Sequence, residues 1–181
     1  MQYLSQVKTS ATTNSPATEV YYRNRSAGEH AVRVSREEYQ QMLESELSKT
    51  YSAKTVDHAL KPRNMGSIEV ASGYARITGP CGDTMEIWLS VDNKIIGEAT
   101  FMTDGCVTTI AAGSMVTEMA KGKPVDEAIQ IGQQDILESL DGLPEESRHC
   151  ALLASNTLKE AIIDYYEYSR DKWKRSYKKQ W

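Results

Sequence analysis

The middle of the chain carries a strict alternation of apolar and polar residues. In DTMEIWLSVD, the residues at positions 85, 87, 89 and 91 are apolar, and most of their neighbours are polar. Such alternation is typical of a strand with one buried face. We expect a tight turn at Asp92 and Asn93, and then a return strand in KIIGEATFMT. Upstream, SIEVASGYARIT predicts a third strand, with a bulge or bend at Gly73. The core side of the return strand is expected to carry Ile95, Ala99 and Phe101.

Helical patterns lie on both sides of these strands. REEYQQMLESELSKTYSAKTVDHAL predicts helix, in one or two pieces, with a capping box at Ser35 and Glu38 and an end before Pro62. After the strands we expect a helix in CVTTIAAGSMVTEMAKG, a shorter one in VDEAIQIGQQDILESL, and a last one. The predicted fold class is therefore α+β, a three-stranded antiparallel meander with helices packed on one face. The apolar stripes of the first and last of these helices contain Val107, Ile110, Ala111, Met115 and Met119, and Ala154, Leu158, Ala161, Ile162 and Tyr165.

The two ends of the chain differ from this middle part. Residues 1–34 are polar and show no sustained period, so we expect a flexible N-terminal tail there. The remaining residues, 35–181, are expected to form one domain, because 181 residues suffice for a single ordinary core. The last seventeen residues, YYEYSRDKWKRSYKKQW, are basic and aromatic, which favours a solvated extension of the final helix.

Composition excludes several classes of function. A formal net charge of −4 gives no reason to expect a nucleic-acid partner. No apolar run approaches the roughly 20 residues that span a bilayer, and no secretory signal precedes the domain, so we expect a cytoplasmic protein without a membrane partner. Three cysteines in a reducing compartment are expected to be free or metal-bound rather than paired.

The three cysteines all fall at the ends of predicted elements. Cys81 lies in the turn GPCGD, Cys106 begins a helix, and Cys150 lies in the first turns of the last helix. Helix N-termini favour thiolates, because free N–H groups there carry partial positive charge. Asp83 and His149 lie within two residues of a cysteine. The pattern therefore predicts a metal site of three thiolates, completed by a carboxylate or an imidazole.

Four segments in this order resemble one known family. They are TYSAKTVDHALKPRNMGSI, CGD, TDGCVTTIAAGSMVTEMAKGK and LPEESRHCALLASNTLKEAI. With these motifs and spacings, residues 50–166 resemble the iron–sulfur cluster scaffold proteins of the IscU/NifU N-terminal type. The resemblance implies that Cys81, Cys106 and Cys150 are cluster thiolates, and that Asp83 or His149 completes or adjusts the coordination.

The same resemblance implies a function and its partners. A cysteine desulfurase delivers sulfur as a persulfide to Cys106 or Cys150, iron binds, and an electron donor such as a ferredoxin completes a cluster, expected to be [2Fe-2S]. The cluster passes to acceptor apo-proteins, so the protein is a scaffold and carrier and not an enzyme. Tyr51 matches a position that the family associates with dimer contact, which makes a homodimer an expectation.

One departure from the family concerns a chaperone. Where many members carry LPPVK, the segment bound by a dedicated Hsp70-type chaperone, this chain has LPEES, with Glu145, Glu146 and Ser147. The departure puts that chaperone interaction in doubt. Arg148, beside His149, is either a substitute positive charge or a solvated helix residue.

Two other functions fit parts of the pattern. Three cysteines with an aspartate or histidine also bind zinc, as in the zinc-containing sulfur acceptors related to this family. Those relatives generally lack the histidine before the last cysteine, which is present here as His149. The other reading is a hydrolase with Cys150 as nucleophile and His149 as base, but adjacent helical residues point roughly 100° apart, which argues against it.

Overall fold

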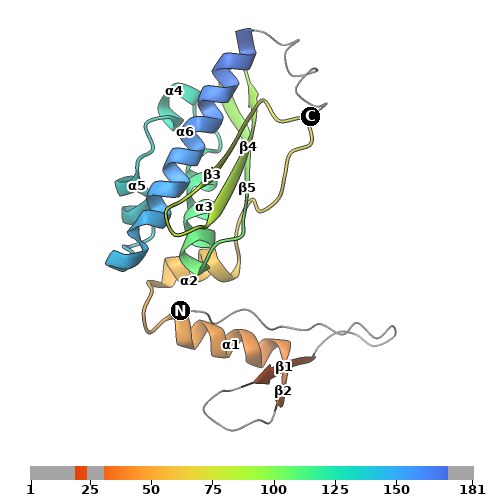
Figure 1. The fold of residues 1–181 in the computed structure, drawn as a ribbon. Coiled ribbons are helices and arrows are strands. Elements are labelled where there is room, and N and C mark those ends of the chain that lie inside the picture. The colour runs from red at the N-terminus through yellow and green to blue at the C-terminus, as the bar shows by residue number, and fades with distance from the viewer. Residues whose placement is uncertain (1–18, 24–30, 171–181) are drawn as a thin grey trace. The chain divides into compact units, whose positions relative to one another are not determined.

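The chain forms two compact units, residues 1–49 and residues 50–181. The computed structural model describes residues 19–23 and 31–170 (Figure 1). In the first unit, β1 (Glu19–Arg23) pairs antiparallel with β2 (Ala31–Ser35), and α1 (Arg36–Leu47) follows directly. The expected domain start at residue 35 thus falls at the junction of β2 and α1, inside the first unit.

The first unit confirms the predicted helix start. The Ser35 hydroxyl accepts the Glu38 backbone N–H at 3.1 Å, and the Glu38 carboxylate accepts the Ser35 N–H at 2.8 Å. This reciprocal pair satisfies two backbone donors that the helix itself leaves free. The predicted flexible tail stays a prediction, because residues 1–18 and 24–30 lie outside the described residues, and so do residues 171–181 of the basic C-terminal segment.

The second unit is an antiparallel sheet with helices on one face, which confirms the predicted fold class (Figure 1). The strands follow the order β3-β4-β5, the meander expected from the sequence. Its elements are α2 (Ala53–Leu60), β3 (Gly73–Thr78), β4 (Thr84–Asp92), β5 (Ile95–Thr103), α3 (Val107–Ala120), α4 (Val125–Ala128), α5 (Gln133–Ser139), the short 3₁₀ helix η1 (Glu145–Ser147) and α6 (Arg148–Arg170).

The core face of β4 agrees with the predicted alternation, but that of β5 does not follow it throughout. The side chains at positions 85, 87 and 89 are fully buried. In β5, however, Val91 pairs with Ile96 and Ser90 with Glu98, which leaves Gly97 as an extra residue. The bulge therefore turns Ile96 into the core and leaves Ile95 47% exposed, contrary to the prediction for Ile95.

The hairpin turn and Gly73 also differ from expectation. The two turn residues are Asn93 and Lys94, both with positive φ, because Asp92 still pairs with Ile95. Gly73 begins β3 and marks no bulge. It lies where α6 crosses the strand, and a Cβ at this position would come 2.2 Å from the carbonyl oxygen of Ala161. Gly73 is thus a point of close approach between sheet and helix.

Helix α3 is the central helix of the second unit. It packs against β5, α2, α5 and α6, so side chains on most of its circumference are buried. The predicted stripe is therefore only part of its buried surface: Val107, Ile110 and Met119 are half-buried, whereas Thr109 and Val116 are fully buried. The neighbouring helices explain the difference, because α2, α5 and α6 cover sides of α3 that do not face the sheet.

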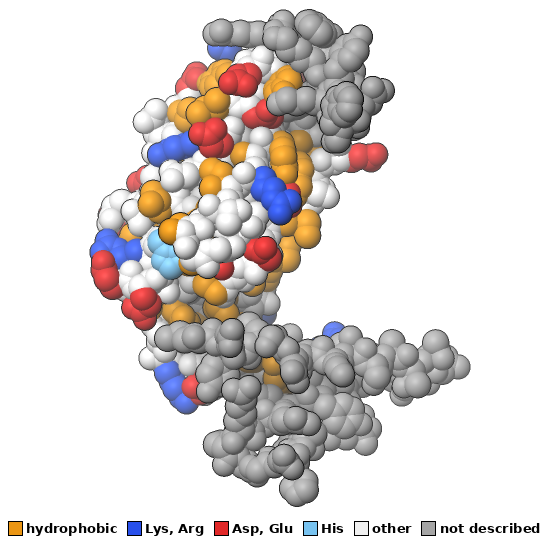
Figure 2. All heavy atoms as spheres, viewed as in Figure 1, with side chains coloured by type: hydrophobic (Ala, Val, Ile, Leu, Met, Phe, Trp, Pro, Cys, Tyr) orange, Lys and Arg blue, Asp and Glu red, His pale blue; other side chains and the backbone are white. Residues whose placement is uncertain are grey.

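The visible surface is of mixed charge. On the face in Figure 2, acidic and basic side chains are interspersed among polar and apolar ones. Among the described helices, none combines the length and apolar character of a membrane span.

We predict that Gly73→Ala destabilises the protein. The added methyl group would meet backbone atoms of α6, which cannot move aside without shifting the helix, so we expect a loss of roughly 1–3 kcal/mol in the free energy of unfolding. Gly97→Ala is the matched control in the same sheet, since the nearest atom to its Cβ is 3.8 Å away. Urea unfolding of both variants measures the difference, and equal stabilities would contradict the close approach.

Candidate functional site

Three separate elements bring one carboxylate and two thiols together. Asp83 follows the turn between β3 and β4, Cys106 precedes α3, and Cys150 is the third residue of α6. A carboxylate oxygen of Asp83 and the sulfur atoms of Cys106 and Cys150 all lie within 4.8 Å of one another. Sulfur and carboxylate donors at this separation could hold a transition-metal ion.

Cys106 is held by its position at the start of α3. It is the N-cap residue, with extended backbone, and its carbonyl accepts the first helical N–H, from Ile110 at 3.0 Å. Its own N–H donates to Oδ2 of Asp83 at 3.2 Å. The helix terminus therefore both exposes the thiol and anchors the carboxylate.

Gly105 makes room for this arrangement. A Cβ at this position would lie 2.6 Å from Oδ2 of Asp83 and 2.7 Å from Cβ of Thr109. Real side chains do not approach so closely, so any larger residue would force the carboxylate away from the helix terminus. Glycine before the cysteine is thus a requirement of the site and not only of the turn.

Two residues that sequence reasoning missed, Thr108 and Thr109, line the space between the two sulfurs. Oγ1 of Thr108 lies 3.0 Å from Sγ of Cys106 and 3.3 Å from Sγ of Cys150. Oγ1 of Thr109 lies 3.4 Å and 3.3 Å from the same sulfurs. The signal in the sequence was a pair of hydroxyl residues in the first turn of a helix, where side chains lie near the N-cap.

The surroundings of Asp83 favour its charged form. Burial by itself raises the pKa of the carboxyl, but hydrogen bonds from the Thr109 hydroxyl and the Cys106 backbone N–H outweigh it. The net effect holds the pKa of Asp83 below its ordinary value, so a carboxylate faces the sulfurs.

The two neighbouring cysteines differ in acidity. A hydrogen bond with Cys150 lowers the pKa of the Cys106 thiol, and hydrogen bonds with the threonine hydroxyls lower it further. The same pair of sulfurs raises the pKa of the Cys150 thiol, and burial raises it more. In the metal-free protein, Cys106 is therefore the thiolate and Cys150 the thiol.

The other two predicted ligands lie at the edge of this group. Cys81 is exposed in its turn, and its thiol hydrogen-bonds to Asp83. Nε2 of His149 lies 3.6 Å from Sγ of Cys150. The structure thus brings all five predicted side chains to one region, with three at its centre.

The contact between His149 and Cys150 corrects one argument made from the sequence. Adjacent residues were expected to point apart on the helix, yet the imidazole reaches the neighbouring sulfur. The hydrolase reading is still disfavoured, for a different reason. Cys150 is fully buried and its pKa is raised, whereas a nucleophile needs an accessible thiolate.

Tyr51 lies close enough to the site for the charges of the cysteines to change the pKa of its hydroxyl. Burial raises the pKa of the Tyr51 hydroxyl, the negative charge of Cys106 raises it further, and a hydrogen bond with Ser147 acts in the opposite direction. The residue is half-buried, directly before α2. Its hydroxyl is thus part of the rim of the site.

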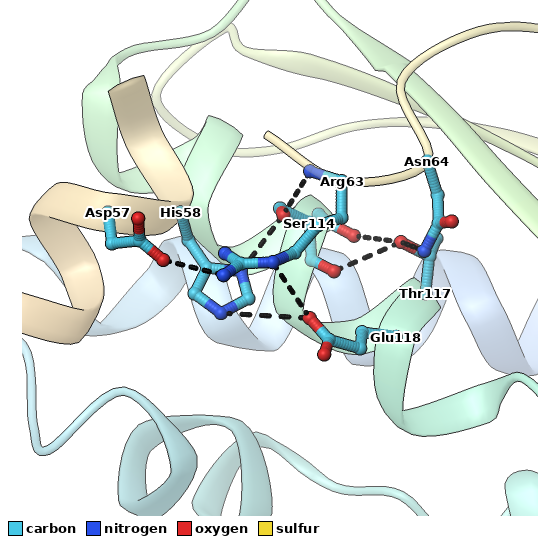
Figure 3. A network of polar contacts seen from close by, with 8 residues as sticks. Asp57, His58, Arg63, Asn64, Ser114, Thr117 and Glu118 are labelled. Carbon is cyan, nitrogen blue, oxygen red and sulfur yellow. Dashed lines mark hydrogen bonds and ion pairs between the residues drawn. The ribbon is translucent and has the colours of Figure 1, made fainter. Parts of the chain in front are cut away.

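A polar network joins α2 and the residues after it to α3 (Figure 3). Oγ of Ser114 accepts the Arg63 N–H at 2.8 Å and lies within hydrogen-bond distance, 2.9 Å, of Nδ1 of His58. Arg63 also pairs with Asp57 at 2.6 Å and with Glu118 at 3.4 Å. Burial lowers the pKa of His58, so the imidazole is neutral here. The network fixes α2, and with it Tyr51, relative to the helix that carries Cys106.

The last three residues of the LPEES segment form η1, directly before the start of α6. Pro144 precedes this turn, and the Ser147 N–H bonds to the Pro144 carbonyl at 2.8 Å. The Arg148 guanidinium pairs with Glu145 at 3.0 Å, on the surface. Its charge is therefore partly neutralised within the same segment, which favours the reading of a surface residue.

The family and the related proteins that this chain matches agree with one another. A family described as the NifU-like N terminal domain matches residues 50–172, which begin where the second compact unit begins. The iron-sulfur cluster assembly scaffold protein IscU 1 of Archaeoglobus fulgidus is 45% identical over 117 residues, 64% of this chain and 76% of that protein. The Escherichia coli scaffold protein IscU is 45% identical over 121 residues, 64% of this chain and 93% of that protein.

A solved structure agrees at the level of the fold. The N-terminal part of a NifU-like protein from Brucella abortus superimposes with a TM-score of 0.54, over 67% of this chain and 97% of that one. The two sequences are 17% identical. The α+β architecture is therefore common to both.

We predict that alkylation of Cys106 persists at low pH. Because the folded-state pKa of this thiol is lowered, the thiolate remains as pH falls from 8 to 6, whereas an ordinary thiolate declines about tenfold per unit. Iodoacetamide labelling of chelator-treated protein, read by mass spectrometry, measures the rate at Cys106. The same peptide labelled in urea is the control, and an equal decline in both states would contradict the prediction.

Proposed function

The chain belongs to the NifU-like N-terminal domain family, and on that premise we propose that it is a scaffold for iron–sulfur cluster assembly. A cluster, [2Fe-2S] in this proposal, is built from iron and desulfurase-derived sulfur and then passed to apo-proteins. The observation that carries the proposal is the convergence of Asp83, Cys106 and Cys150 within 4.8 Å.

The cargo would be held by residues of three elements. Cys81, Cys106 and Cys150 supply thiolates, the ligands that iron–sulfur clusters use. Asp83 or His149 supplies the remaining position with oxygen or nitrogen. Since three thiolates and one harder ligand retain a cluster less firmly than four thiolates, the set suits a protein that gives its cluster away.

The redox balance explains the need for an electron donor. Sulfur arrives as a persulfide on Cys106 or Cys150, of which the exposed Cys106 thiolate is better placed to accept it than the buried Cys150 thiol. Each sulfur takes up two electrons to become sulfide. Oxidation of ferrous to ferric iron supplies only one electron per iron. A [2Fe-2S] cluster with both irons ferric therefore needs further electrons from a reductant, such as a ferredoxin.

The partners follow from the steps. A cysteine desulfurase, an electron donor and acceptor apo-proteins each meet the protein during one cycle. Tyr51, at the rim of the site, is proposed to assist dimer contact or sulfur transfer. No small molecule is turned over, so the role is that of a scaffold and carrier.

The competing proposal is a zinc-containing sulfur acceptor with the same ligands. His149 disfavours zinc as the main cargo, because the zinc-containing acceptors generally lack a histidine at this position. Its Nε2 lies at the site, 3.6 Å from Sγ of Cys150. Zinc remains compatible with the donor set of the purified protein.

Reconstitution separates these two proposals. Anaerobic incubation with iron, cysteine and a desulfurase is expected to give visible charge-transfer bands, with matched iron and acid-labile sulfide. Cys106→Ser should lose them, because a thiolate ligand is removed. A colourless protein with one tightly held zinc, which still accepts sulfur, would replace the scaffold proposal with the sulfur acceptor.

Cluster transfer tests the proposed role of Asp83. We predict that Asp83→Ala slows transfer to an apo-ferredoxin, because the carboxylate is the exchangeable ligand at which the acceptor's thiolate enters. The rate is read from the change in circular dichroism as the cluster moves between proteins. Transfer by the variant at the wild-type rate or faster would count against this role.

A further inference from the structure

Thr108 and Thr109 make similar contacts with the two sulfurs, but they differ in their contact with the Asp83 carboxylate. Each hydroxyl lies within 3.4 Å of both Cys106 and Cys150. Only the Thr109 hydroxyl also reaches Oδ2 of Asp83, at 2.6 Å. Both threonines are buried, at 1% and 0% exposure, so water does not compete for these bonds.

The single proton of the Thr109 hydroxyl goes to Asp83. A carboxylate only accepts, and a short O–H···O⁻ bond is stronger than a hydrogen bond to sulfur. The contact of the Thr109 hydroxyl with Sγ of Cys150, at 3.3 Å, is then weaker than its bond to the carboxylate. One side chain thereby orients the carboxylate toward the pair of cysteines.

Of the two residues in the Thr109–Asp83 hydrogen bond, Thr109 is held more rigidly by the fold than Asp83. Thr109 lies in the first turn of the buried helix α3, and its branched side chain is restricted in rotation. Asp83 follows an exposed turn in which Gly82 has a positive φ. Its Oδ2 is held on α3 by the Thr109 hydroxyl and by the Cys106 N–H. Without the hydroxyl, the carboxylate keeps the weaker bond from the Cys106 N–H at 3.2 Å and the contact with the thiol of the exposed Cys81, and it gains freedom to turn toward water.

We propose that Thr109 is a positioning residue that holds the Asp83 carboxylate on the cysteine pair for capture of a divalent metal ion. The proposal rests on the scaffold function and specifies how its iron site is kept ready before iron arrives. Residues that orient a metal ligand in this way typically change metal affinity 10–100-fold when removed.

The experiment measures cobalt(II) binding to the metal-free, full-length protein. Thiolate charge-transfer bands report the sulfur ligands, and the d–d bands report the geometry and the oxygen ligand. Thr109→Val keeps the shape and removes the hydroxyl, and we expect it to weaken cobalt binding at least about 10-fold. The d–d bands should shift toward those of Asp83→Ala, and Thr109→Ser should restore both affinity and spectrum.

Thr108→Val is the matched control. It removes a hydroxyl from the same turn, with the same two sulfur contacts and the same burial, but with no bond to the carboxylate. In the Thr108→Val background, Asp83→Ala should retain its full effect on cobalt affinity. In the Thr109→Val background, Asp83→Ala should add little, because the two changes remove one interaction.

Several results would overturn the proposal. Additive effects of Thr109→Val and Asp83→Ala would mean that the hydroxyl acts elsewhere, and wild-type affinity in Thr109→Val would mean that it does not matter. If Thr109→Val does not fold, the comparison of Thr109→Ser with Thr109→Ala decides by the same criteria. If the wild-type protein gives no cobalt–thiolate bands, the proposed scaffold site is overturned as well. If the wild type gives these bands and only the results for the Thr109 variants differ from expectation, the Thr109 proposal alone is overturned.

Discussion

Burial of α3 is the constraint on which the site depends. The helix is packed between the sheet and three other helices, so its first turn cannot shift without disturbing the core. That turn carries Cys106, Thr108 and Thr109, and the crossing helix α6 presents Cys150 to it. A rigid helix terminus thus holds a thiol and two hydroxyls in place, while the more exposed turn of Cys81 and Asp83 is held to it by hydrogen bonds.

The site combines a buried floor with an open rim. Cys150 is fully buried, whereas Cys81 and Cys106 are exposed. Hydrogen bonds keep Asp83 charged and make Cys106 the more acidic of two adjacent thiols. Negative charge is therefore present at the rim of the site, and binding of a metal ion by Cys150 would require loss of its proton.

The functional region lies within one of the two units. The family match begins at residue 50, and the site residues, Tyr51 included, all fall in the second unit. The first unit, with its hairpin and the helix α1, lies outside that match. All five predicted ligands, by contrast, belong to the second unit.

The sequence by itself determined the fold class and the main chemistry. Alternation at positions 85, 87 and 89 defined the core face of β4, and the helix patterns defined its cover, because periodicity follows directly from backbone geometry. The ordered motifs around Cys81, Cys106 and Cys150 identified the candidate ligands. Local patterns of this kind can be recognised in the sequence because each depends on a few consecutive residues.

Only the tertiary structure decided what depends on contacts between distant segments. Gly97, and not Gly73, is the bulge, because strand register is set by pairing across the sheet. Gly73 is instead required by the approach of α6. The bond between Thr109 and Asp83 joins residues 26 positions apart, and no local pattern marks one threonine of the pair as different from the other. The assignment of roles within the site therefore came from packing, which places side chains that the sequence leaves unrelated.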